Sequence, residues 1–178
     1  MILLQKQTLT NILKSEKFQL SAIYFIAFLV PFLFKQPQIL IGSTVNFLLI
    51  FSVSQFDTKK IIPLLFVPSI SSLLSGVLFG AFTPYLLYMI PFIATANFIL
   101  ILSFKYIQIK YLRIVISSLL KASFLFSCAY ILVNTVHIPQ IFLTTMGAIQ
   151  FLTALIGLLC CELLFTFSKN RNNKVITA

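Results

Sequence analysis

The sequence predicts an all-α membrane protein with six transmembrane helices and both termini in the cytoplasm. Three observations support this fold class: an excess of hydrophobic residues, their division into six apolar runs, and the distribution of basic residues between the runs. Of the 178 residues, 60% are hydrophobic and only 9% are charged, whereas soluble domains average roughly 45–50% and 25%. A soluble core cannot absorb this excess, so we expect a lipid environment.

The apolar runs have the length that a membrane helix requires. About 20 apolar residues, each rising about 1.5 Å, cross a hydrocarbon layer roughly 30 Å thick. We predict one transmembrane domain over 1–178, with a cytoplasmic amphipathic segment at 1–17 and a cytoplasmic tail at 169–178. The predicted helices cover about residues 18–34, 39–56, 61–80, 85–104, 112–133 and 141–168.

Short polar segments separate the runs. The segment 35–38 (KQPQ) follows the first run, and 57–60 (DTKK) follows the second. A turn at 81–84 joins the third run to the fourth, so these two helices are expected to be antiparallel neighbours. The basic stretch 105–113 and the loop 134–140 separate the remaining runs.

The basic residues predict the orientation. Cytoplasmic loops of membrane proteins carry an excess of Lys and Arg. With six spans, eleven of the 13 basic residues fall on the side of the termini, while Lys35 falls on the other side and Lys121 inside a helix. Topology therefore explains the formal charge of +10, and we expect no nucleic-acid partner.

Lys121 is the strongest indication of a site, because an ionisable group at the bilayer centre costs roughly 2.5–3.5 kcal/mol on insertion scales. It lies in the fifth predicted helix, roughly 15 Å from the cytoplasmic boundary, too deep for its amine to reach water easily. Glu162 is the only acidic residue within a predicted helix. Three alternatives are open: Glu162 pairs with Lys121 and locks two helices together, a ligand carboxylate or phosphate supplies the counter-charge, or desolvation leaves the Lys121 amine neutral.

Four other predicted helices carry a polar residue at similar depth: Asn46, Ser72, Asn97 and Gln150. Together with Lys121, these residues are the predicted substrate-binding site, since a few polar groups in an apolar pocket orient a small ligand. The alternative is that they only form hydrogen bonds that hold the helices together.

Prolines and small residues mark how the helices should pack. The third and fourth predicted helices are interrupted by prolines, which remove backbone donors, so we expect these helices to form cavity walls. Small residues spaced by four, which let helices approach closely in lipid, occur at Ser72, Gly76 and Gly80 and at Thr153, Gly157 and Cys161.

Catalytic and metal-binding patterns are missing from the sequence. It contains no Gly-rich phosphate loop, no Ser/His/Asp arrangement, no carboxylate pair and no CxxC spacing among its three cysteines. We therefore expect no enzymatic activity, no cofactor and no metal site.

Four segments of the chain resemble a known family. They are FVPSISSLLSGVLFGAFTPYLLYMIPFIATAN at 66–97, GSTVN at 42–46, LLKASFLF at 119–126 and QFLTALIG at 150–157. Together they resemble the substrate-binding S components of energy-coupling factor (ECF) vitamin transporters. Many S components carry an AxxxA docking pattern on the first helix, whereas here Ala22 and Ala27 are five residues apart.

The resemblance implies a small multi-pass subunit in a prokaryotic plasma membrane. Such a subunit captures a vitamin-like ligand from outside and docks on an ECF coupling protein with two ATPase subunits. With the residues above, the expected function is a membrane-embedded substrate-binding subunit of a small-molecule importer for an anionic ligand. The alternative is a structural or accessory multi-helix membrane protein without a ligand.

Overall fold

The computed structural model describes residues 15–34, 36–76 and 79–176, with side chains up to residue 168. Within these residues every regular element is helical, which confirms the all-α prediction. The long helices are α2 (Glu16–Leu33), α3 (Gln38–Gln55), α6 (Leu86–Tyr106), α7 (Lys110–Thr135) and α9 (Gln150–Ile176).

Five segments of the described chain are long and apolar enough to cross a membrane. They are Glu16–Leu33, Gln38–Gln55, Gly80–Tyr106, Lys110–Thr135 and Ile141–Ser168. Each of them corresponds to one of the six predicted helices. The third predicted helix, 61–80, has no such counterpart because it is broken.

This broken helix consists of α4 (Thr58–Ile61), the 3-10 helix η1 (Ile62–Leu65) and α5 (Val67–Ser75). Pro63 and Pro68 cause the breaks, since neither has a backbone N–H to continue the helical hydrogen bonds. Gly76 ends α5 in the left-handed conformation with φ of 68°, which glycine adopts without strain. The predicted ridge of small residues at Ser72, Gly76 and Gly80 is therefore wrong as a helical feature.

The other predicted helix boundaries agree to within two residues, apart from three larger differences. The 3-10 helix η2 (Gly80–Tyr85) precedes α6 where a turn was expected. The sixth segment comprises α8 (Ile141–Thr144), the π-helix η3 (Thr145–Ile149) and α9, and α9 continues to Ile176 beyond the predicted end at 168. Most of the predicted amphipathic segment at 1–17 lies outside the described residues, and Ser15 caps α2 by accepting a hydrogen bond from the Phe18 amide.

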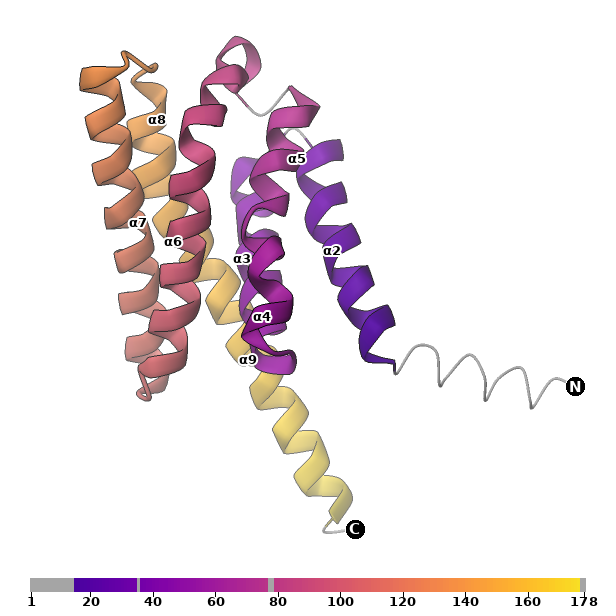
Figure 1. Cartoon of the computed structure of the whole chain (residues 1–178). Helices are drawn as coiled ribbons and strands as arrows, with labels where there is room; N and C mark the ends of the chain where they lie inside the picture. Colours follow the sequence, from indigo (N-terminus) through magenta and orange to yellow (C-terminus); the bar gives the residue numbers. More distant parts are fainter. Residues whose placement is uncertain (1–14, 35, 77–78, 177–178) are drawn as a thin grey trace, which may run out of the picture.

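The basic segments gather at one end of the bundle. The start of α2, the helix α4, the connection between α6 and α7, and the end of α9 lie at the same end in Figure 1. Lys59 and Lys60 belong to α4, and Lys110 and Arg113 to the start of α7. The elements α8 and η2 lie at the opposite end. The placement of this end and of both termini in the cytoplasm stays a prediction.

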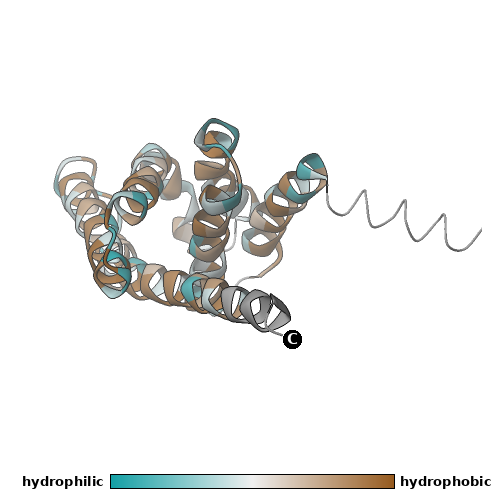
Figure 2. Ribbon diagram, turned by 90° about the horizontal axis from the view of Figure 1, so that it is seen from below, coloured by the Kyte–Doolittle hydropathy of each residue, from teal (hydrophilic) through white to brown (hydrophobic). Residues whose placement is uncertain are grey.

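The outward faces of the helices are apolar. Hydrophobic residues predominate along the helices, and hydrophilic ones gather toward the helix ends in Figure 2. Large side chains such as Phe25, Leu87 and Ile131 are 58–63% exposed. Exposed apolar surface of this extent is typical of a protein that contacts lipid.

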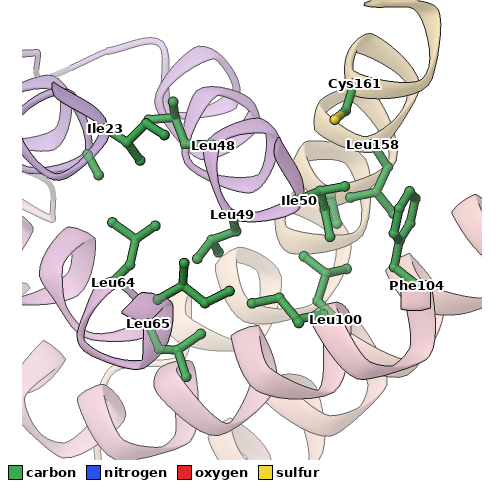
Figure 3. Close-up of a cluster of buried hydrophobic side chains, with 14 of the residues drawn as sticks. Ile23, Leu48, Leu49, Ile50, Leu64, Leu65, Leu100, Phe104, Leu158 and Cys161 are labelled. Atoms are coloured by element: carbon green, nitrogen blue, oxygen red, sulfur yellow. The ribbon is translucent and has the colours of Figure 1, made fainter. Parts of the chain in front are cut away.

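Two clusters of buried apolar side chains form the interior. The first packs α2, α3, η1, α6 and α9 together and includes Leu49, Leu64, Leu100 and Leu158 (Figure 3). The second joins α6, α7, α8 and η3 and includes fully buried Phe142, whose ring stacks on that of Phe79, the residue before η2. The polar residues of the candidate site lie at the border between these two clusters.

Candidate functional site

Lys121 lies in the middle of α7 and is almost completely buried, with 2% of its surface exposed. It is eleven residues beyond Lys110, the first residue of the helix, which corresponds to about 16 Å along the axis. Its Nζ donates hydrogen bonds to Asn46 Oδ1 at 2.6 Å and to Asn97 Oδ1 at 2.7 Å. The amine therefore links α7 to α3 and to α6.

Both asparagine amides are oriented by a second hydrogen bond. Asn46 Nδ2 donates to Thr153 Oγ1 at 3.3 Å, and Asn97 Nδ2 donates to the Leu65 carbonyl at 3.0 Å. Leu65 is the last residue of the 3-10 helix η1, just before the start of α5. The break in the third segment thus supplies the acceptor that turns the Asn97 oxygen toward Lys121.

A cavity of about 80 Å³ adjoins this network. Pro31 near the end of α2 and Gln38 at the start of α3 line it, so it extends from Lys121 toward the end of the bundle opposite the termini. Its walls are mainly apolar. They include Ile41, Val45, Phe79, Leu86, Ile93 and Met146.

All five predicted site residues line this one cavity: Asn46, Ser72, Asn97, Lys121 and Gln150. Among these five residues, hydrogen bonds connect Lys121 with Asn46 and Asn97, and the other two are not joined to them. Within the described residues, the Ser72 hydroxyl and the Gln150 amide have no hydrogen-bond partner, and both border the cavity. Their polar atoms are therefore available to a ligand.

The sequence interpretation missed three polar residues of the cavity: Gln38, Ser69 and Thr153. Thr153 supplies the oxygen that orients Asn46, and Ser69 lines the cavity one turn before Ser72. Thr153 had a signal in the sequence, since it begins the run of small residues that continues at Gly157. Ser69 had none, because its position depends on where α5 begins.

Glu162 does not pair with Lys121. The Glu162 carboxylate binds Arg113, lies 3.9 Å from the Lys110 amine, and is 6% exposed. The Arg113 guanidinium also lies 4.4 Å above the ring of Phe104. The interpretation in which Glu162 and Lys121 form an ion pair is therefore wrong, because Glu162 lies about 18 Å further along α9 than Gln150.

The two other acidic residues of the chain are also far from the cavity. Glu16 pairs with Lys60, and Asp57 is exposed in the connection between α3 and α4. Lys121 consequently has no acidic partner among the described side chains. The described residues also contain no cluster of His, Cys, Asp and Glu that could hold a metal ion.

The arrangement offers a basic group and hydrogen-bond donors at the inner end of an apolar cavity. The π-helix η3 contributes Met146 and Ile149 to the cavity wall, and Gln150 follows η3 in the sequence. π-Helical turns occur frequently at functional sites. Chemically, such a cavity can hold a small anion whose apolar part contacts the walls.

Comparison with known proteins identified no relative. No protein-family model matches the chain, and no curated protein and no solved structure is significantly similar to it.

Proposed function

We propose that this protein is a membrane-embedded substrate-binding subunit of a small-molecule importer, similar to an ECF S component, that captures an anionic ligand. The observation that carries the proposal is the contact of Lys121 with Asn46 and Asn97 at the inner end of a cavity. A buried basic residue without an acidic partner is costly in lipid. A bound anion would offset that cost.

The direction of capture follows from the positions of the cavity and the basic segments. The cavity extends away from the end that carries Lys59, Lys60 and Lys110. The positive-inside rule assigns that basic end to the cytoplasm, so the cavity faces outward across a prokaryotic plasma membrane. Transport would then require a separate energy source, for which an ECF coupling protein and ATPase subunits are the proposed partners.

The cavity volume bears on the size of the ligand. Sites for drug-sized molecules measure roughly 300–1,000 Å³, whereas this cavity measures about 80 Å³. A vitamin-sized ligand would therefore require the outer walls to separate. The polar groups at the inner end of the cavity could contact the ligand without moving.

A second function, a structural or accessory membrane protein, is favoured by a different observation. The amides of Asn46 and Asn97 already have partners on both sides. Such amides serve as connections between helices in lipid. In this case the Lys121 contacts would only hold α3, α6 and α7 together.

Native mass spectrometry of the gently purified protein and of the Lys121→Met variant tests these two functions. The importer function predicts a small molecule that copurifies with the wild type and is missing from a folded variant, together with attached coupling subunits. An empty wild type and a variant that loses its fold would show that Lys121 is structural and would rule out the importer function.

A further inference from the structure

The hydrogen-bond partners of Lys121 match a neutral amine. A neutral amine has two N–H groups and one lone pair, whereas an ammonium group has three N–H donors. The described residues offer Lys121 two acceptors, Asn46 Oδ1 and Asn97 Oδ1. A third N–H of an ammonium group would be left without a protein partner at the cavity.

The charges around Lys121 favour the same state. The segments α3, η1, α5, α8 and η3 contain no ionisable side chain. The neighbouring helices carry other ionisable side chains, which are described up to residue 168. They are the exposed Tyr88, Lys105 and Tyr106 of α6, the cysteines and Glu162 of α9, and Lys110, Tyr111, Cys128, Tyr130 and the Glu162-bound Arg113 of α7. Among the described side chains, none is an anion that faces the amine. An unpaired ammonium group in an apolar, buried site is strongly disfavoured.

The single basic group also restricts the ligand. Lys121 is the one basic side chain among the described residues that line the cavity, so after it takes up a proton it can balance one negative charge. A phosphate group carries about two charges near neutral pH and would leave one unpaired. A carboxylate carries one charge, and the Ser72 hydroxyl and the Gln150 amide are additional donors at the same cavity.

We propose that the cavity takes up a monocarboxylic acid together with its proton. This inference rests on the proposed function of ligand capture and adds the ligand class and the stoichiometry. In the empty protein Lys121 is a neutral amine. When the acid enters, its O–H bond breaks, the proton bonds to the Nζ lone pair, and an ammonium carboxylate pair remains. At a pH where the free acid is ionised, the solution supplies that proton, so binding adds no net charge to the membrane interior.

Acetate and acetamide are suitable probes because they have nearly the same shape and differ in charge. An apolar cavity of about 150 Å³ admits benzene, and this cavity of about 80 Å³ requires a smaller molecule. The measurement is nitrogen NMR of the ¹⁵N-lysine-labelled protein in detergent at about pH 8, where exposed lysines are ammonium groups. The Lys121 signal is identified by its absence from the Lys121→Met variant.

The proposal predicts an amine signal for Lys121 in the empty protein, which acetate converts to an ammonium signal and acetamide leaves unchanged. The dissociation constant for acetate should rise about tenfold for each pH unit in this range, because one proton is taken up with each ligand. The Lys110→Met variant is the matched control. It removes a lysine from the same helix, outside the cavity, and should retain both effects.

Other outcomes overturn the proposal. An ammonium signal from Lys121 before acetate is added would exclude proton uptake while leaving ligand capture intact. An amine signal that acetate does not change, at concentrations that preserve the fold, would exclude the carboxylate class. In either case a ligand found by native mass spectrometry would still support the importer function, and its chemistry would then replace the one proposed here.

Discussion

Gly157 of α9 packs directly against Asn46 of α3. A Cβ atom at Gly157 would lie 2.8 Å from Asn46 Cβ and 2.6 Å from the Ser43 carbonyl oxygen. Both distances are shorter than real Cβ atoms show to other heavy atoms. Gly42 makes a similar close approach to Thr153 on the same pair of helices. The close contact of α3 and α9 therefore places Asn46 within reach of both Thr153 and Lys121.

The first prediction concerns this contact. Gly157→Ala should destabilise the protein by about 1–3 kcal/mol, because the new methyl group would contact backbone atoms that cannot move without separating the helices. Thermal unfolding in detergent measures the effect. Gly147→Ala is the control, since its Cβ would meet the edge of the Phe126 ring, and Phe126 is an exposed side chain that can rotate. Equal losses in the two variants would contradict a special role for Gly157.

The second prediction concerns Asn97, which contacts Lys121 and Leu65. In Asn97→Asp a carboxylate lies beside the amine and supplies the missing counter-ion, so Lys121 should give an ammonium signal without any ligand, and acetate binding should be lost. The nitrogen NMR measurement described for acetate detects both changes. An Asp variant that still binds acetate like the wild type would contradict the position of the anion site.

Asn97→Leu provides the corresponding test of stability. Both variants leave the Leu65 carbonyl without a donor, because an aspartate carboxylate only accepts hydrogen bonds. Asn97→Leu also leaves one Lys121 N–H without an acceptor, at a cost of about 1–3 kcal/mol for a buried group. We therefore expect Asn97→Leu to unfold at a lower temperature than Asn97→Asp. The reverse order in thermal unfolding would show that these hydrogen bonds contribute little to stability.

The third prediction concerns the ion pair between Arg113 and Glu162. Either Arg113→Met or Glu162→Met alone should destabilise the protein by about 3 kcal/mol. Glu162→Met leaves the Arg113 guanidinium without its carboxylate, and Arg113→Met leaves the largely buried Glu162 with only the Lys110 amine, 3.9 Å away. The double substitution should cost less than the sum of the two single ones. Unfolding of all four proteins in detergent measures the coupling. Additive losses would mean that the two side chains act independently.

The fourth prediction compares two adjacent buried serines of α7. Ser117 is fully buried and, within the described residues, its hydroxyl has no hydrogen-bond partner, whereas the Ser118 hydroxyl donates to the Ile114 carbonyl at 2.8 Å. Ser117→Ala should therefore stabilise the protein by about 1 kcal/mol. Ser118→Ala should destabilise it by a similar amount. The order of the two unfolding temperatures is the measurement, and equal temperatures would contradict the difference in bonding.

The sequence predicted the helical segments well because a membrane span needs only length and hydrophobicity. It predicted less of the third segment, where Pro63 and Pro68 signalled an interruption but did not specify its form. The division into α4, η1 and α5 depends on which neighbouring groups donate to the backbone carbonyls near the breaks, as Asn97 does to Leu65. Such partners are far apart in the chain, and a local pattern does not contain them.

By itself, the sequence determined the all-α class, the division into apolar segments, the segregation of basic residues between them, and the position of Lys121 in the middle of an apolar segment. Tertiary structure decided that Asn46 and Asn97 face Lys121, that Glu162 binds Arg113 instead, and that the five polar residues share one cavity. The physical reason is that helices with apolar residues on every side have no defined phase in the sequence. Only the packing of one helix on another, as at Gly157 and Asn46, determines which side faces the interior.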